Sequence, residues 1–307
     1  MLSRIAESLF WIGRYIERAE DTARILDVHT QLLVEDPAID PQAAGLDLLA
    51  AMGARQDPPI GPTTIMSRLC HDPLSSSSIV AAVRGVRESA QRARETVSIE
   101  MWEGINTTWH SVREGQLAGM RPQSAFRFVR ERCAVISGIA DSTMSHDEGW
   151  LFVVLGRTIE RVDMTARMIR SGRSASSSTA WSNVLRACGA HHEFTRTYGG
   201  HPSDREAAEF ILLDRLFPRS VVYTLTEAER AALDLEVGQR RSGFDMDASR
   251  QLGRARAELE FRPLDETLSD LNARMYALQQ TCSLATDAIS IRYFEGAAPE
   301  EWKGGAS

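Results

Sequence analysis

The sequence contains, at residues 13–25, the stretch Gly13-Arg14-Tyr15-Ile16-Glu17-Arg18-Ala19-Glu20-Asp21-Thr22-Ala23-Arg24-Ile25. A close copy follows 143 residues later (156 − 13) as Gly156-Arg157-Thr158-Ile159-Glu160-Arg161-Val162-Asp163-Met164-Thr165-Ala166-Arg167-Met168, and eight of the thirteen positions are identical. Several identical positions are charged, whereas a repeat kept only for packing would need nothing beyond its apolar spacing. The sequence therefore predicts a duplicated helical unit with a functionally important charged face.

Both copies have the spacing of amphipathic helices. At about 100° per residue, the apolar residues of each copy share one side of the helix and the charged residues share the other. The charged sides carry Arg14, Glu17, Arg18 and Asp21 in the first copy, and Arg157, Glu160 and Arg161 in the second. Met164 stands opposite Asp21, so we expect the two faces to differ at this position.

Helical periodicity dominates the remaining sequence, and prolines stand where helices would begin or end. The predicted fold is all-α, a multi-helix antiparallel bundle with an internal pseudo-repeat. Residues 76–116 predict one long helix, which would be the backbone of the bundle. The other helices are expected at about 3–34, 42–53, 123–144, 147–171, 179–198, 204–215, 219–236, 247–261 and 264–295. We expect a flexible connector at 171–178.

Composition limits the classes of function. The net charge of −7 argues against nonspecific nucleic-acid binding, and no apolar run is long enough to span a membrane. The first ten residues lack the apolar region of a signal peptide. The four cysteines are far apart, as expected for reduced thiols of a cytoplasmic protein.

The basic residues are almost all arginine. Lys303 is the only lysine and stands in a Gly-rich tail. A P-loop, a Schiff-base site or a nucleotide clamp needs a lysine in the folded core. The sequence therefore argues against ATP chemistry of these kinds, and it indicates no cofactor.

Three interpretations of the repeated charges stay open. In the first, the faces are solvated or form structural ion pairs; if the two helices pack together, Arg18 could meet Glu160 and Arg161 could meet Glu17. In the second, the four repeated arginines present forked donors to a carboxylate or phosphate in a shared pocket. In the third, the same faces bind a partner protein.

Other constellations give weaker signals. No Glu lies three residues before a histidine, which excludes the Glu-x-x-His pairs of a di-iron bundle, and we predict no metal site. Glu100, Trp102 and Asn106 could line a cavity. Asp147, in His146-Asp147-Glu148, precedes the second repeat helix and is expected to cap it.

The opening residues, from Met1-Leu2-Ser3-Arg4-Ile5-Ala6-Glu7-Ser8-Leu9-Phe10-Trp11-Ile12 into the first repeat, resemble the start of the bacterial alpha-E domain family. Further matches are Glu100-Met101-Trp102-Glu103-Gly104-Ile105-Asn106, Asp147-Glu148-Gly149-Trp150, Phe210-Ile211-Leu212-Leu213 and Phe217-Pro218-Arg219-Ser220-Val221. The resemblance implies a single all-helical alpha-E domain at 1–295, with repeat halves of about 1–145 and 146–295 and a flexible tail at 296–307. It also makes Arg219 a secondary candidate for ligand binding.

The resemblance further implies a setting, because alpha-E genes commonly lie beside an ATP-grasp-type ligase, often with a transglutaminase-like peptidase. We therefore expect a helical accessory subunit of amide or peptide ligation that binds an anionic peptide or acyl group through its Arg/Glu faces. One alternative is an enzyme with Glu17 and Glu160 as general acid and base. Another is a purely structural scaffold.

Overall fold

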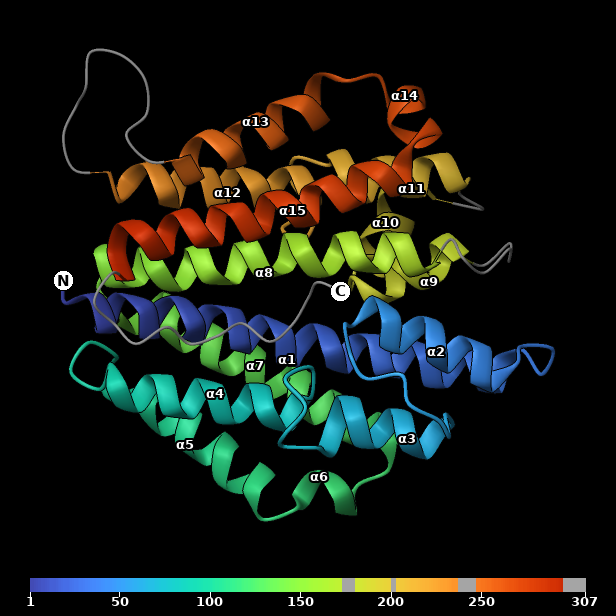
Figure 1. The fold of residues 1–307 in the computed structure, drawn as a ribbon, viewed down its shortest axis with the longest axis horizontal. Coiled ribbons are helices and arrows are strands. Elements are labelled where there is room, and N and C mark those ends of the chain that lie inside the picture. Colours follow the sequence, from blue (N-terminus) through green and yellow to red (C-terminus); the bar gives the residue numbers. More distant parts are fainter. Residues whose placement is uncertain (173–179, 200–202, 237–246, 295–307) are drawn as a thin grey trace.

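The fold is a bundle built from two sets of four helices (Figure 1). The computed structural model describes residues 1–172, 180–199, 203–236 and 247–294, and within these ranges the regular structure is helical, without strands. The first set consists of α1 (Ser3–Glu35), α4 (Ile79–Arg92), α5 (Ile99–Arg113) and α7 (Pro122–Thr143). The second consists of α8 (Glu148–Gly172), α12 (Val221–Asp234), α13 (Asp247–Phe261) and α15 (Leu271–Ile289). The predicted all-α, multi-helix fold is confirmed.

Shorter helices connect and cover these sets. They are α2 (Pro41–Ala51), α3 (Pro62–Met66), α6 (Gln116–Gly119), α9 (Ala180–Ala187), α10 (His191–Tyr198), α11 (Asp204–Leu213) and α14 (Leu264–Ser269), with the π-helical turns η1 (Ser67–His71) and η2 (Ser290–Phe294). None of the helices in the described ranges is long and apolar enough to cross a membrane. The predicted connector at 171–178, from residue 173 on, and the predicted tail at 296–307 lie outside the described residues.

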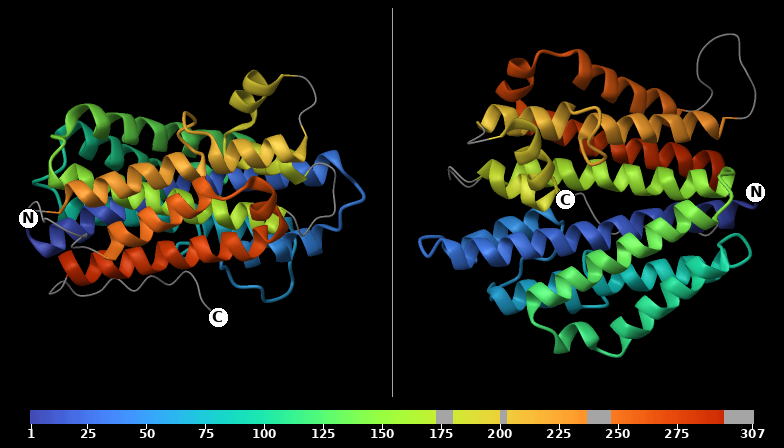
Figure 2. Two further views of the ribbon diagram at one scale, coloured as in Figure 1. Left: turned by 90° about the horizontal axis from the view of Figure 1, so that it is seen from above. Right: turned by 180° about the vertical axis from the view of Figure 1, so that it is seen from behind.

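Helices α1 and α8 lie side by side at the centre and join the two sets (Figures 1 and 2). Within each set successive helices alternate in direction, so α8 starts at the end of the molecule where α1 starts. Contacts follow the same order along both: the amino terminus of Met1 lies 3.5 Å from Glu148, and Glu17 bonds Arg161. The two repeat helices are thus parallel to each other inside an otherwise alternating bundle.

The repeated glycines let these two helices approach closely. A Cβ atom at Gly13 would overlap the carbonyl oxygen of Val153, and one at Gly156 would overlap that of Phe10. Only glycine allows such backbone contact. The glycine shared by the two copies therefore marks the crossing of α1 and α8.

The single long helix predicted at 76–116 is wrong, because the chain turns between α4 and α5. Ser78 caps α4 by accepting from the amide of Ala81 at 3.0 Å. A second cap follows at Ser98, which accepts from the amide of Met101 at 3.1 Å and starts α5. The apolar spacing continues across the turn, which is why the periodicity alone did not show it.

Two other predicted helices are also interrupted. The segment 179–198 breaks into α9 and α10 at Gly189, whose φ of +66° ends α9 in the left-handed region. The segment 264–295 divides at Asp270 into α14 and α15. These breaks leave the overall helical class unchanged.

Candidate functional site

The charged faces of α1 and α8 meet each other instead of facing water. Arg18 donates from Nε to Oε1 of Glu160 at 2.6 Å. Arg161 donates to both carboxylate oxygens of Glu17, from Nε and Nη2, at 2.7 Å each. These are the two pairs that the first interpretation predicted for helices packed together.

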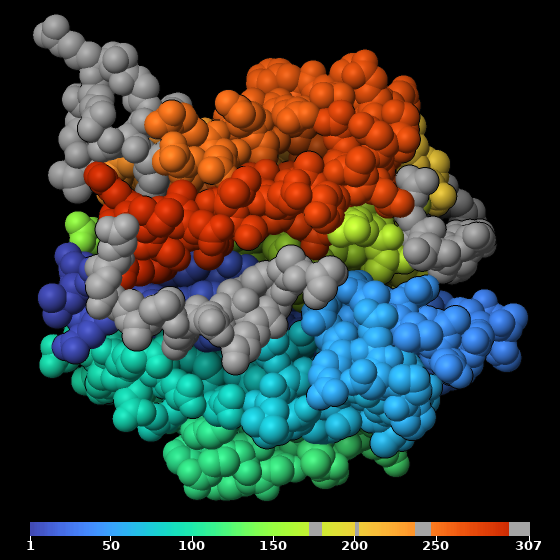
Figure 3. Space-filling model, in the orientation of Figure 1, coloured from blue at the N-terminus to red at the C-terminus, as the bar shows by residue number. Residues whose placement is uncertain are grey.

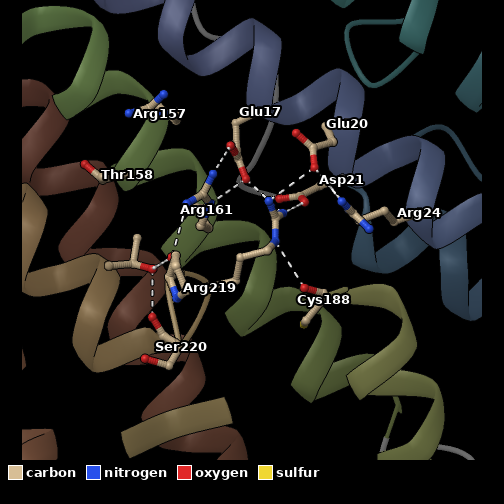
Figure 4. Close-up of polar contacts among 12 residues, drawn as sticks. Glu17, Glu20, Asp21, Arg24, Arg157, Thr158, Arg161, Cys188, Arg219 and Ser220 are labelled. Atoms are coloured by element: carbon tan, nitrogen blue, oxygen red, sulfur yellow. Dashed lines mark hydrogen bonds and ion pairs between the residues drawn. The ribbon is translucent and has the colours of Figure 1, made fainter. Parts of the chain in front are cut away.

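Each glutamate also receives a second guanidinium group. Arg14 donates from Nε to Oε2 of Glu160 at 2.6 Å. Glu17 is instead approached by Arg219, from the loop before α12, whose Nη2 lies 2.9 Å from Oε1 (Figure 4). Both glutamates are therefore held by two arginines, but the second arginine comes from a different element in each case.

Further carboxylates surround the two glutamates. We call Glu17, Glu20 and Asp21, with Arg24, Arg161 and Arg219, the first centre. Glu160 and Asp163, with Arg14, Arg18 and Arg167, form the second centre. Arg24 pairs with Glu20 at 2.7 Å and Arg167 pairs with Asp163 at 2.8 Å, so these i,i+4 pairs are equivalent. The first centre has three acids against three arginines, and the second has two against three.

The two central glutamates are ionised. Each side chain is 1 % exposed. Burial alone would raise the pKa of Glu17, but Arg161 and Arg219 outweigh it and lower the pKa to about 2. Arg18 and Arg14 likewise overcome burial and lower the pKa of Glu160 to about 2. Neither carboxyl group is protonated near neutral pH.

Asp21 behaves in the opposite way. Burial raises its pKa to about 8, and the neighbouring Glu17 and Glu20 add to this rise, although Arg219 contacts Asp21 directly and opposes it. Arg219 is shared among three carboxylates, so it compensates each of them only in part. Asp21 therefore takes up a proton at a higher pH than Glu17 does.

The loop at residues 214–220 holds Arg219 in place. Ser220 caps α12 and donates from Oγ to the carbonyl oxygen of Asp214. The Oδ1 of Asp214 accepts from the amide of Leu216 at 2.8 Å. Arg219 itself donates from Nε to the carbonyl oxygen of Cys188 at 3.1 Å, after the end of α9.

A matching loop lies at residues 72–78, before α4. Ser78 donates to the carbonyl oxygen of Asp72, and Ser77, at the position that corresponds to Arg219, donates to the carbonyl oxygen of Met52 at 3.0 Å. The sequence carries the signal Asp-x-Leu-x-x-x-Ser in both loops, 142 residues apart (214 − 72). This second repeat, which sequence reasoning missed, would have aligned Arg219 with Ser77. It supports the predicted repeat, and the equivalence of the whole halves stays a prediction.

A small cavity adjoins the second centre. It is lined by Arg18, Met52, Ser76, Ser77, Glu160, Asp163, Met164 and Arg167, and its volume of about 20 Å³ has room for about one water molecule. Ser77 and Met164 are the counterparts of Arg219 and Asp21. The cavity therefore lies where the first centre holds an arginine and its carboxylate.

The other predicted residues lie outside the two centres. Arg157, the counterpart of Arg14, approaches Asp141 at 3.3 Å. Asp147 accepts from the amide of Gly149 at 2.8 Å and caps the start of α8, as predicted. Glu100 is exposed on α5.

Trp102 and Asn106, also on α5, contact Arg87 of α4. The Arg87 guanidinium carbon lies 5.2 Å from the centre of the Trp102 ring, and its Nε donates to Asn106 at 3.3 Å. Arg94 lies over the same ring at 5.2 Å. This group belongs to the contact between α4 and α5, and not to the centres between α1 and α8.

The repeated Glu-Arg pairs are also the feature by which a known protein family is described. A family model described as an alpha-helical domain with a conserved ER motif, Alpha-E, matches residues 1–294. The chain belongs to the Alpha-E family. The Glu-Arg pairs Glu17-Arg18 and Glu160-Arg161 of this Alpha-E chain are the residues that bond across α1 and α8.

Two mycobacterial relatives of this Alpha-E chain are described as uncharacterized proteins. Protein Rv2567 of Mycobacterium tuberculosis is 28% identical over 269 residues, which cover 76% of this chain and 29% of that protein. Protein Mb2597 of Mycobacterium bovis is 27% identical with the same coverage. The chain thus spans less than a third of the length of these relatives. No solved structure matches it.

Proposed function

We propose that this chain is a helical accessory module of an amide- or peptide-ligation system, in which an ATP-grasp-type ligase carries out the ATP chemistry. A transglutaminase-like peptidase is the second proposed partner, and the cytoplasm is the proposed location. In this proposal the Glu-Arg motif joins the two helix sets and is not the reactive site. The observation that carries the proposal is that the Glu-Arg motif of α1 pairs with the Glu-Arg motif of α8.

The pairing of the arginines supports a structural role for the motif. Arg14, Arg18 and Arg161 all donate to glutamate carboxylates within the chain. An anionic ligand at these residues would have to displace a buried carboxylate, and removing one partner of a buried pair typically costs about 3–5 kcal/mol. We therefore place any anionic ligand elsewhere on the molecule.

The same geometry argues against Glu17 and Glu160 as general acid and base. A general acid near neutral pH needs a pKa close to that pH. The arginines hold both pKa values at about 2, and the carboxylate oxygens face guanidinium groups. An arrangement with one desolvated, protonated glutamate would be needed instead.

The relatives support the accessory role. Their matched region makes up 29% of each protein, so this domain occurs there beside a larger remainder of chain. The only lysine of the present chain is Lys303, which leaves the helical core without the ammonium group of a nucleotide clamp. The four cysteines are free and buried, which supports a reducing compartment.

The test is reconstitution with the ATP-grasp-type ligase encoded nearest to this chain. We expect the two proteins to co-purify, and we expect peptide ligation, measured with ATP turnover, to rise as the chain is added and to level off at a fixed ratio. A helical protein of similar size and charge is the control. A ligation rate that is unchanged by the chain, without complex formation, would overturn the proposal.

A folded variant of the first centre tests the role assigned to the motif. The double variant Asp21→Met/Arg219→Ser places the residues of the second centre at these two positions, balances two acids with two arginines, and should keep the fold. We expect it to support ligation as the wild type does. If it keeps its unfolding midpoint and its complex with the ligase but loses ligation, the motif takes part in the reaction and its purely structural role is wrong.

A further inference from the structure

A groove lies between α13 and α15. Its volume is about 430 Å³, within the range of about 300–1,000 Å³ common for ligand pockets. The two helices that form it lie next to each other on the face seen in Figure 3. The lining residues are Asp247, Arg250, Gln251, Arg254, Ala255, Glu258, Leu259, Arg262, Thr267, Arg274, Met275, Ala277, Leu278, Thr281 and Leu284.

The floor of the groove is apolar. Leu259, Met275 and Leu278 are buried beneath it, and Ala255 and Ala277 keep the space between the helices open because their side chains are short. Such a floor favours aliphatic side chains, whose transfer from water is favourable by about 25 cal/mol per Å².

The charged rim is predominantly basic. Four arginines line the groove against two carboxylates. Glu258 accepts from two of these arginines, Arg262 at 3.1 Å and Arg274 at 2.5 Å, and Asp247 lies 3.3 Å from Arg250. Arg254 is exposed and makes no hydrogen bond or ion pair with any residue in the described ranges. The rim therefore has donors for an anion.

The groove also contains a buried acceptor. Within the described part of the chain, the Oε1 atom of Gln251 is buried and receives no hydrogen bond. Buried polar atoms are nearly always paired, and an amide N–H is a suitable donor for this oxygen. A ligand with backbone amides would supply this donor once the side chain of Gln251 turns its amide into the groove that it lines.

We propose that this groove binds a short, extended, acidic peptide. A carboxylate of the peptide pairs with Arg254, an amide N–H donates to Gln251, and apolar side chains lie on the floor between Ala255 and Ala277. From residue 247 to residue 259 α13 rises about 18 Å at 1.5 Å per residue, which matches about five residues of extended chain. The inference does not rest on the proposed ligase partnership, and it is tested on the chain alone.

The test measures fluorescence anisotropy with two labelled hexapeptides. One alternates leucine and glutamate and has a free carboxyl terminus; the other alternates leucine and glutamine and is amidated. We expect the acidic peptide to bind at least about tenfold more tightly, and its binding to weaken with added salt. Equal binding of both peptides, or no binding of either, would overturn the proposal.

Charge reversal locates the carboxylate. Arg254→Glu should raise the Kd of the acidic peptide by about tenfold or more, because an attractive contact becomes repulsive. The control is Arg127→Glu, the same charge reversal at an exposed arginine on α7, whose side chain is 69 % exposed. If both variants bind as the wild type does, Arg254 is not the binding group.

Blocking the groove separates this site from the rest of the surface. Ala277→Trp fills the space between the helices, whereas Ala273→Trp changes an exposed residue of the same helix that does not line the groove. We expect only Ala277→Trp to abolish binding. Unchanged binding by this variant contradicts the proposal, as does a dimer in sedimentation that Ala277→Trp dissociates, because the occupant would then be a second copy of the chain.

Discussion

The two ion-pair centres between α1 and α8 contain the same motif, but its glutamates have different arginine partners. In the first, Glu17 is held by Arg161 and by Arg219 from a loop. In the second, Glu160 is held by Arg18 and by Arg14, which lies on the repeat helix itself. Both solutions give each glutamate two guanidinium groups.

The two centres differ together at two positions that are far apart in the sequence. Where the loop supplies Arg219, the helix carries the extra acid Asp21; where the loop has Ser77, the helix carries Met164. Arg157, whose counterpart Arg14 serves Glu160, pairs with Asp141 instead. The charge of each centre is thus set by the loop before α4 or α12 as much as by the repeat.

The largest effect is expected from removing a central carboxylate. Glu160→Ala leaves Arg14 and Arg18 buried without their partner, so we expect the free energy of unfolding at pH 7 to fall by about 3–5 kcal/mol. Glu17→Ala should have a similar effect through Arg161 and Arg219. Urea unfolding followed by circular dichroism measures both.

The exposed Glu131→Ala on α7 is the control for these variants, and it should change stability by less than about 0.5 kcal/mol. A loss below about 1 kcal/mol for Glu160→Ala would mean that the arginines find other partners or reach water. The ion pairs of the two centres would then contribute little to the free energy of unfolding.

A smaller effect distinguishes the first centre from the second. Arg219→Ser leaves three buried acids with two arginines, and we expect a loss of about 2–4 kcal/mol. Adding Asp21→Met places the residues of the second centre at both positions and leaves two acids with two arginines. It should recover a large part of that loss, with a coupling energy of about 1–3 kcal/mol in a double-mutant cycle.

The reverse change serves as the control for this cycle. Met164→Asp adds a buried acid to the second centre, where Ser77 stands in place of Arg219, and it should destabilise the protein. Strictly additive effects of Asp21→Met and Arg219→Ser would show that the two positions are independent, contrary to the comparison.

The smallest expected effect is a pH dependence of stability that comes from Asp21 in the first centre. The folded-state pKa of Asp21 is about 8, above its ordinary value of 3.8, so the native state binds more protons than the unfolded state between these values. Asp21 therefore lowers stability as pH rises through this window, by about 1 kcal/mol between pH 6 and pH 7. Glu17 and Glu160 have the opposite sign, but only between about pH 2 and 4.5.

Unfolding free energies of the wild type and Asp21→Asn at pH 6 and pH 7 measure this contribution. The variant should lose the decrease, because its amide does not titrate in this range. If both proteins show the same slope, the proton is bound by another group and the assignment to Asp21 is wrong.

Some of this structure follows from the sequence and some does not. Charges repeated at Glu17-Arg18 and Glu160-Arg161 suffice to pair each glutamate with the arginine of the other copy, once the helices pack together. Apolar periodicity predicts the helices, but it continues across Ser98, which caps the start of α5, and across Gly189, whose left-handed backbone ends α9. The direction of α8 relative to α1 depends on the number of long helices between them. The sequence predicted one long helix at 76–116 where the structure has α4 and α5, so it did not give this direction.

The groove between α13 and α15 shows a second limit. The apolar positions of α13 and α15 have the same spacing as in fully packed helices, and only the short side chains of Ala255 on α13 and Ala277 on α15 distinguish them. Whether short side chains leave a space depends on the helix that packs opposite, which is a property of the tertiary structure.

The parallel direction of α1 and α8 also determines when these two helices can pack together during folding. Parallel helices cannot be joined by a short turn, and Glu17 lies 144 residues before Arg161 and 202 before Arg219 (219 − 17). At a synthesis rate of about 5–20 residues per second, α8 is completed on the order of 10–30 s after α1. Contacts of such large sequence separation form late and slowly. The glutamates and arginines of α1 therefore remain in water while the first helix set assembles, and the two sets join only after α8 has been made.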